Sequence, residues 1–199
     1  MKEHNTAMLD RRAVVSRILR DRGDALAISS LGNPTFDLAA AGDCPRNFYL
    51  WGAMGGAVMV GLGLAQARPT NRVIVFVGDG EMMMGLGSLA TVAVHAVPNL
   101  SVVVVDNEHY AETGMQPAHA GRGVDIAAVA KACGFETALL VRTEAELEAA
   151  AEDILHAPRP VLAAIKVSTA PQPTALPPRD GPYLRSRFRE ALLGSDAHR

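Results

Sequence analysis

The chain is poor in cysteine, in aromatic residues and in net charge. Its 199 residues include two cysteines, Cys44 and Cys133, a single tryptophan, and a formal net charge of −2. Two cysteines without CxxC spacing form neither a disulfide framework nor a zinc or iron–sulfur site, so we expect both to be small buried residues. The near-neutral charge gives no reason to expect nucleic acid or a membrane surface as a partner.

The chain also lacks a long hydrophobic run. Residues 1–22 are charged and contain no apolar signal core, and no run reaches the length of a membrane span. These features predict a cytoplasmic protein without a membrane partner. The hydrophobic content of 49% is ample for a core, and the length fits one domain.

Helical patterns and apolar runs alternate along the chain. Strands separated by helices are typical of a doubly wound parallel sheet, so we predict an α/β fold. Asp125 is positioned to cap one helix, and Thr143 with Glu146 forms a capping box that opens another. The predicted helices cover 8–22, 54–67, 81–95, 125–133, 143–156 and 184–193, and the predicted strands cover 25–28, 73–77, 102–105, 138–141 and 160–167.

Three segments carry no regular pattern. We predict a turn at 31–34, where Gly-Asn-Pro is turn chemistry, and a loop over 108–123, which is polar and glycine-rich. Residues 169–182 carry five prolines and should be extended. We therefore expect residues 1–168 to form the domain and residues 169–199 to form a proline-rich tail with a terminal helix.

Two short polar motifs follow the strongest apolar runs. Gly78-Asp79-Gly80 comes after Val73–Val77, and Asp106-Asn107 comes after Val102–Val105. In open α/β folds, ligands bind at the edge where parallel strands end, so Asp79 and Asn107 should lie side by side there. Their oxygen atoms suit Mg²⁺, and the glycines beside Asp79 allow the backbone to approach a phosphate. The alternative is a plain sheet domain with an ordinary Gly-Asp-Gly turn.

This constellation resembles the diphosphate-anchoring motif of thiamine-diphosphate enzymes, which is GDG followed by an Asn-Asn or Asp-Asn pair. The resemblance implies a thiamine-diphosphate-binding fold of the pyrophosphate type. It also implies that Asp79, Asn107 and the backbone carbonyl of His109 bind Mg²⁺. The cofactor-binding segments would be Gly78 to Glu81 and Asn107 to Tyr110, through Gly78, Asp79, Gly80, Glu81, Asn107, His109 and Tyr110.

A second segment extends the resemblance. Leu50 to Gly55 is similar to the family segment that holds the aminopyrimidine ring. By position, Gly52 supplies the carbonyl that accepts a hydrogen bond from the 4′-amino group. Ala53 follows it, and Met54 is the apolar wedge that bends the cofactor. The alternative is that Met54 simply begins a core helix. Gly32 and Asn33 match a further turn that touches the cofactor, although Gly-Asn-Pro is also an ordinary turn.

Within the superfamily, the chain is most similar to sulfopyruvate decarboxylase β subunits and to the C-terminal half of phosphonopyruvate decarboxylases, over about residues 25–190. Three positions depart from the usual pattern. Asp106 replaces the commoner Asn, His109 stands where many relatives have Gly, and Met115 occupies a loop position often held by Gly. The segments that carry the likeness are 52–55, 78–80, 87–91, 106–108 and 113–117.

The family chemistry requires a glutamate that tunes the pyrimidine ring, and this glutamate belongs to a separate pyrimidine-binding domain. None of the ten glutamates of the chain has the expected sequence context. We therefore expect a partner (α) subunit that carries the glutamate, in a hetero-oligomer built on dimers. The expected function is the β subunit of a 2-oxo acid decarboxylase, with a small substrate that bears a sulfonate or phosphonate group.

Several readings remain open at this level. A carboligase would use the same cofactor to join a fragment to an aldehyde, and a non-catalytic nucleotide-binding or assembly module could use the same fold. Glu81 either hydrogen-bonds to groups around the metal or simply begins a helix, where an acidic residue interacts favourably with the helix dipole. His109 and His119 are candidates for proton transfer, although an exposed loop histidine is the commoner case.

Overall fold

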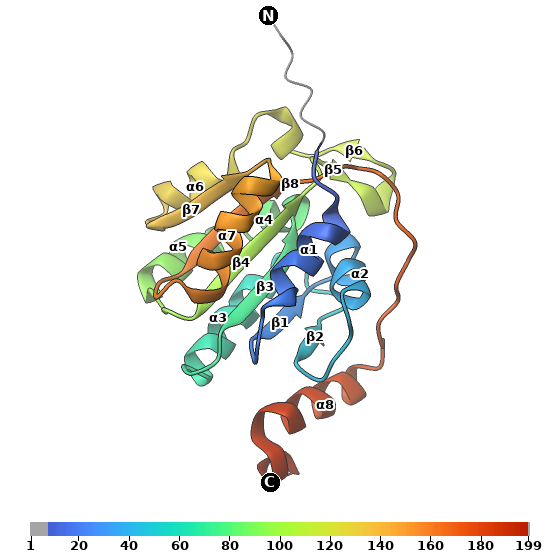
Figure 1. The fold of residues 1–199 in the computed structure, drawn as a ribbon, viewed down its shortest axis with the longest axis vertical. Coiled ribbons are helices and arrows are strands. Elements are labelled where there is room, and N and C mark those ends of the chain that lie inside the picture. Colours follow the sequence, from blue (N-terminus) through green and yellow to red (C-terminus); the bar gives the residue numbers. More distant parts are fainter. Residues whose placement is uncertain (1–7, 199) are drawn as a thin grey trace, which may run out of the picture.

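A computed structural model describes residues 8–198. Its centre is a six-stranded sheet in the order β2-β1-β3-β4-β8-β7, and every neighbouring pair is parallel (Figure 1). The predicted doubly wound α/β fold is confirmed. The strands are β1 (Leu26–Ser29), β2 (Asn47–Tyr49), β3 (Val73–Gly78), β4 (Leu100–Asp106), β7 (Thr137–Val141) and β8 (Val161–Lys166).

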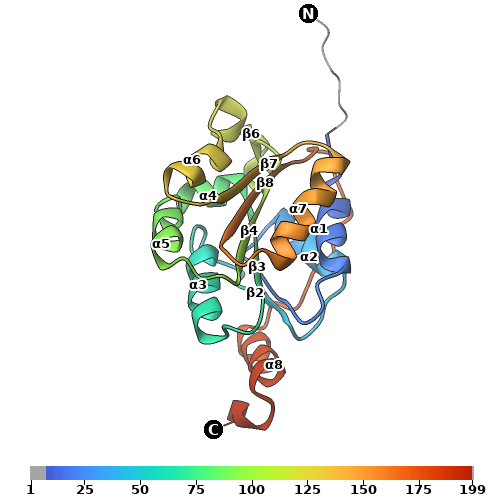
Figure 2. The same cartoon turned by 60° about the vertical axis from the view of Figure 1, so that its left-hand side comes forward.

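Helices cover both faces of the sheet (Figure 2). Successive side chains of a strand point to opposite faces, so Ile74 and Val75 of β3 belong to two different cores. Strands buried on both faces read as continuous apolar runs, which explains the valine-rich sequence of β4. One face carries α1 (Arg11–Arg20), α2 (Asn33–Ala40) and α7 (Glu144–His156); the other carries α3 (Ala57–Ala67), α4 (Asp79–Met84), α5 (Gly87–His95) and α6 (Ile126–Ala132).

Both predicted helix caps are present. The Asp125 side chain accepts a hydrogen bond from the Ala128 amide at 2.9 Å, at the start of α6. Thr143 and Glu146 form the reciprocal capping box at the start of α7. Each cap satisfies amide groups that have no partner inside the helix, so the local sequence alone sets where these helices begin.

The prediction of one helix over 81–95 was wrong, because the segment forms two helices separated at Gly85 and Leu86. The break lies where Gly85 touches the backbone of Gly55. A Cβ atom on Gly85 would lie 2.2 Å from the carbonyl oxygen of Gly55. For the same reason the preceding helix begins at Ala57 rather than at Met54, since residues 54–56 form a turn against Gly85.

Two elements between β1 and α3 were not predicted. Helix α2 begins at Asn33, directly after Gly32 with its positive φ of 66°, so the expected turn over 31–34 is in part the first turn of a helix. Strand β2 is three residues long and lies at the edge of the sheet. Its sequence, Asn-Phe-Tyr, is too short to give a period.

The region predicted as a loop contains short regular pieces. Residues 108–123 include a two-stranded antiparallel hairpin, and two 3-10 turns lie beside it. The hairpin strands are β5 (His109–Tyr110) and β6 (Gln116–Pro117), and the 3-10 turns are η1 (Ala111–Thr113) and η2 (Ala120–Arg122).

The two cysteines are free, and both are half-buried rather than fully buried as expected.

The C-terminal segment runs along the outside of the domain (Figure 1). Residues 169–180 contain no helix or strand, and α8 (Gly181–Leu193) and η3 (Gly194–His198) follow them. The indole Nε1 of Trp51 donates to the Pro178 carbonyl at 2.7 Å, and Arg187 pairs with Asp43 at 2.7 Å. A domain division near residue 168 stays a prediction. None of the described helices is long and apolar enough to cross a membrane.

Candidate functional site

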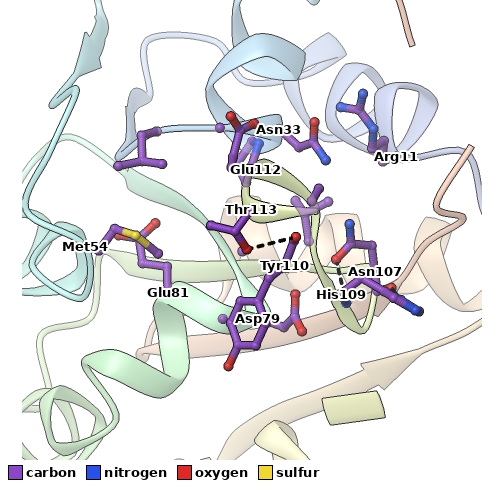
Figure 3. Close-up of a pocket in the computed structure, with 17 residues that line it drawn as sticks. Arg11, Asn33, Met54, Asp79, Glu81, Asn107, His109, Tyr110, Glu112 and Thr113 are labelled. Atoms are coloured by element: carbon purple, nitrogen blue, oxygen red, sulfur yellow. Dashed lines mark hydrogen bonds between the residues drawn. The ribbon is translucent and has the colours of Figure 1, made fainter. Parts of the chain in front are cut away.

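The pocket lies at the point where the strand order reverses. Strands β1 and β3 are neighbours, but α2 after β1 covers one face and α4 after β3 covers the other. Because the helices that follow these two adjacent strands cover opposite faces of the sheet, a crevice forms between them at the carboxyl ends of the strands. A pocket of about 660 Å³, open to solvent, occupies this place and is lined by residues 31–34, 78–81, 105, 107 and 109–113 with Arg11 and Met54 (Figure 3).

Asp79 is a buried carboxylate in this pocket with an unpaired oxygen. The residue is 2% exposed, and its Oδ2 atom has no hydrogen-bond partner among the described residues. Burial first, and repulsion from Asp106 second, raise the pKa of Asp79 to about 7, against the backbone N–H groups at 79 and 80 and Lys166. A carboxylate in this setting is stabilised by a bound cation, which fits the predicted role of Asp79 toward Mg²⁺.

Asn107 and His109 stand on a turn that its own side chains hold in shape. The Asn107 Oδ1 atom accepts from the His109 amide at 3.1 Å, and the ring Nδ1 of His109 lies 2.9 Å from the Asn107 carbonyl. Between them Glu108 has a positive φ of 62°, which is uncommon for a residue other than glycine. The turn therefore places Asn107 and His109 along the pocket, and their role as metal ligands stays a prediction.

A buried cation lies behind this turn. The Nζ atom of Lys166, at the end of β8, is 2.8 Å from Asp106 and 2.7 Å from Glu108. Asp106 also accepts from the Glu108 amide at 3.0 Å. Lys166 therefore offsets the negative charge that Asp106 brings to this buried position. Nothing in the sequence pattern suggested this contact, because Lys166 is 58 positions from Glu108.

The segment from Trp51 to Gly55 has an unusual backbone. Trp51 and Ala53 both have φ of 55°, and the Ser30 hydroxyl donates to the Gly52 carbonyl at 3.0 Å. A carbonyl has two lone pairs, so Gly52 keeps one for a ligand. Met54 is 40% exposed, lies at one end of the pocket and precedes α3, so the alternative in which it begins a core helix does not hold, while its role toward the cofactor stays a prediction.

Glu81 lies beside Met54 at the same end of the pocket (Figure 3). It is 4% exposed, and its Oε1 atom has no partner among the described residues. Burial raises the pKa of Glu81 to about 7, although the neighbouring Ser30 side chain and Gly55 backbone act to lower it. Glu81 therefore lies in the pocket with one buried carboxylate oxygen that has no partner among the described residues.

The two candidate histidines lie in different places. His109 lines the pocket, whereas His119 does not and is exposed. The Nδ1 atom of His119 is 2.9 Å from the Tyr110 hydroxyl. The Tyr110 ring packs on Gly80, where a Cβ atom would lie 2.5 Å from it. Gly80 is thus required for Tyr110 to close over the GDG turn.

Most of the predicted cofactor-binding residues line one pocket, and the exceptions are Gly52 and Ala53. Sequence reasoning missed Arg11 and Glu112, which also line it. Glu112 has no local motif, and Arg11 belongs to a helix that precedes the first strand. The predicted residues that do line the pocket are Gly32, Asn33, Met54, Gly78, Asp79, Gly80, Glu81, Asn107, His109 and Tyr110.

Comparison with known proteins agrees with this geometry. The family model for the thiamine pyrophosphate enzyme, C-terminal TPP binding domain, matches residues 31–165. The chain belongs to this family. The match covers the three segments that form the pocket, so the GDG turn and the Asp-Asn turn belong to the thiamine pyrophosphate enzyme domain itself.

Individual relatives of this thiamine pyrophosphate enzyme domain include decarboxylases. The chain is 43% identical over 128 residues to sulfopyruvate decarboxylase subunit beta of Methanothermobacter thermautotrophicus, which is 64% of this chain and 68% of that one. It is 36% identical over 182 residues to phosphonopyruvate decarboxylase of Streptomyces hygroscopicus, which is 90% of this chain but 45% of that one. A thiamine diphosphate-dependent 4-hydroxybenzoylformate decarboxylase from Rhodococcus jostii shares the fold, with a TM-score of 0.68, 19% identity, and coverage of 82% of this chain and 33% of that one.

The residues of the pocket fit the family cofactor. Asp79 has a buried oxygen without a partner, Gly80 leaves no side chain between the turn and Tyr110, and Asn107 adds an amide oxygen. Among residues 8–198, no group of three or more His, Cys, Asp or Glu side chains could hold a metal ion alone. A metal at Asp79 would therefore need amide, carbonyl and phosphate oxygens as further ligands.

Proposed function

We propose that this chain is the diphosphate-binding (β) subunit of a thiamine-diphosphate- and Mg²⁺-dependent 2-oxo acid decarboxylase. The observation that carries the proposal is the Asp79 carboxylate, which is buried in the crevice beside Asn107 with one oxygen unpaired. A divalent cation would satisfy this oxygen and would also attract a diphosphate. The names of the relatives support decarboxylation.

In this proposal each end of the pocket has its own task. Asp79, the Asn107 side chain and the His109 carbonyl hold Mg²⁺, while the backbone of 78–80 and of 32–33 approaches the phosphates. Gly52 accepts a hydrogen bond from the aminopyrimidine, and Met54 supports the bent cofactor. When bound, thiamine diphosphate supplies a carbanion that adds to a ketone carbonyl and a ring that accepts electrons as CO₂ leaves.

The substrate in this proposal is a small 2-oxo acid with a sulfonate or phosphonate group. The printed names of the two relatives, a sulfopyruvate decarboxylase subunit and a phosphonopyruvate decarboxylase, support this class. We place the enzyme in the cytoplasm as part of the same proposal.

The partner in this proposal is a separate α subunit that carries the catalytic glutamate. Helices α3, α4 and α5 lie on one face of the sheet and expose apolar side chains, which supports a protein partner on that face. The exposed fractions are 41% for Met59, 40% for Val60, 65% for Met84 and 84% for Val94. The assembly would be a hetero-oligomer built on dimers.

A cofactor titration tests the proposal. The affinity of the full chain for thiamine diphosphate should depend on Mg²⁺, and Asp79→Ala should abolish that dependence because the metal loses its charged ligand. Asp24→Ala, which removes an exposed carboxylate far from the pocket, is the matched control and should bind like wild type. Equal affinities with and without Mg²⁺ in all three proteins would instead favour a non-catalytic module.

A further inference from the structure

Arg11 is a buried cation that reaches the pocket from outside the matched family segment. It opens helix α1, its side chain is 7% exposed, and it lines the pocket. Figure 3 places Arg11 at the end of the pocket near Asn33 and Asn107, opposite Met54 and Glu81. Arg11 therefore lies at the end where the proposed metal ligands gather.

The Arg11 guanidinium is held by a single carboxylate that it shares. Its NH1 atom donates to Asp37 at 2.5 Å, and the Nε atom of Arg12 donates to the other Asp37 oxygen at 3.3 Å. Two guanidiniums with one carboxylate leave a net positive charge. No other hydrogen bond of Arg11 to the described residues is found, so several N–H groups of its planar fork remain for a ligand.

The other charged residues of the pocket indicate which ligand group these N–H groups can bind. Among the described lining residues Arg11 is the single Arg or Lys, whereas Asp79, Glu81 and Glu112 are acidic. A diphosphate carries more negative charge than one Mg²⁺ neutralises, and Asp79 adds to the excess. A second cation at the phosphate end would offset it, and a guanidinium fork matches the geometry of phosphate oxygens.

We propose that Arg11 binds the terminal phosphate of thiamine diphosphate, and that Asp37 holds Arg11 in position. This inference rests on the proposed function and deepens it. The terminal phosphate is the group concerned because Met54 marks the ring end of the pocket and Arg11 marks the opposite end. Arg11 then distinguishes a diphosphate from a monophosphate, since the monophosphate lacks the group that Arg11 contacts.

Arg12 provides a matched control for the test. It pairs with the same Asp37, but it does not line the pocket, and it also donates to the Pro173 carbonyl at 2.7 Å. The variants are R11Q, which keeps a hydrogen-bond donor for Asp37 without the charge, and R12Q. Calorimetry measures the affinities of the full chains for thiamine diphosphate and thiamine monophosphate at saturating Mg²⁺, and thermal unfolding checks the fold.

We expect R11Q to lose affinity for thiamine diphosphate but not for thiamine monophosphate. R11Q should weaken thiamine diphosphate binding by about ten- to a hundredfold, which is the range for a charged hydrogen bond, and should change monophosphate binding by less than about threefold. R12Q should leave the ratio of the two affinities as in wild type. A wild-type ratio in R11Q, or equal changes in R11Q and R12Q, would overturn the role of Arg11 while the proposed function stands.

The experiment also distinguishes a failure of the proposed function from a failure of the R11Q variant to fold. Wild-type chain that does not bind thiamine diphosphate with Mg²⁺ would overturn the proposed function, and the inference with it. If R11Q does not fold, R11K replaces it, because lysine keeps a charge for Asp37 but has no fork. R11K should bind the diphosphate several-fold more weakly with unchanged monophosphate affinity, and wild-type affinity for both would contradict the proposal.

Discussion

The Nζ atom of Lys166 lies 2.8 Å from Oδ2 of Asp106, at the ends of the adjacent strands β8 and β4. Both side chains are buried, with exposed fractions of 8% and 2%. A buried ion pair contributes little net stability, but removal of one partner leaves an uncompensated charge. The pair thus ties the turn that carries Asn107 to a strand distant in sequence.

Lys166→Met should therefore lower the unfolding free energy strongly by itself, but only weakly when it is combined with Asp106→Asn. The single variant leaves Asp106 buried without its cation and should lose about 3–5 kcal/mol of unfolding free energy. Asp106→Asn in the same chain removes the stranded charge and should recover most of the loss. Urea unfolding of the two single variants and the double variant measures the coupling. Additive losses would show that the pair is not coupled.

The unliganded chain should lose stability as the pH rises from about 4 to 7. Asp79 and Glu81 both have folded pKa values of about 7, above their ordinary values of 3.8 and 4.5, so the folded state binds more protons in this window. Each group should lower the unfolding free energy by about 1.4 kcal/mol per pH unit there, and the effect levels off above pH 7. Urea unfolding of wild type and Asp79→Asn across this range measures the difference.

Metal affinity should show the opposite trend. Mg²⁺ requires the ionised form of Asp79, so Mg²⁺ affinity at saturating thiamine diphosphate should fall about tenfold per pH unit below pH 7. Binding should release protons at pH 6, which calorimetry in buffers of different ionisation enthalpy detects. A metal affinity that is constant between pH 5 and 8 would argue against Asp79 as a ligand.

Met54→Ala should lower turnover of the assembled enzyme far more than it lowers stability. Met54 is 40% exposed at the pocket, whereas Met82 is 1% exposed in the core. Met82→Ala, as the matched control, should cost about 2–5 kcal/mol, the range for a buried methionine. Thermal unfolding and activity per folded molecule separate the two roles. A Met54→Ala protein as unstable as Met82→Ala, with normal turnover, would place Met54 in the core instead.

The chain alone should not decarboxylate 2-oxo acids, and it should form a hetero-oligomer with its α subunit. Assays of CO₂ release with thiamine diphosphate and Mg²⁺, with and without the partner, check this. Glu81 and Glu112 are the described glutamates that line the pocket. Saturable CO₂ release by the chain alone would contradict the prediction, and Glu81→Gln and Glu112→Gln would then identify the glutamate responsible.

Local patterns predicted the parts of this protein that depend on near neighbours in the sequence. The caps at Asp125 and Thr143 involve groups within three residues, and the unbroken apolar runs that lead to Gly78 and Asp106 are strands buried on both faces. The GDG and Asp-Asn turns could be placed together because parallel strands end at one edge. The family was recognised by the resemblance of these two turns to a known motif, and the family match confirms it.

Tertiary structure decided the rest, because the deciding contacts join distant residues. The backbone of Gly55 interrupts a helical pattern at Gly85, and Lys166 compensates Asp106. Arg11 reaches the pocket only because α1 packs beside α2 and Asp37 holds it there. Such contacts leave no periodic trace in the sequence, since their energy depends on burial and charge that exist only after the sheet has formed.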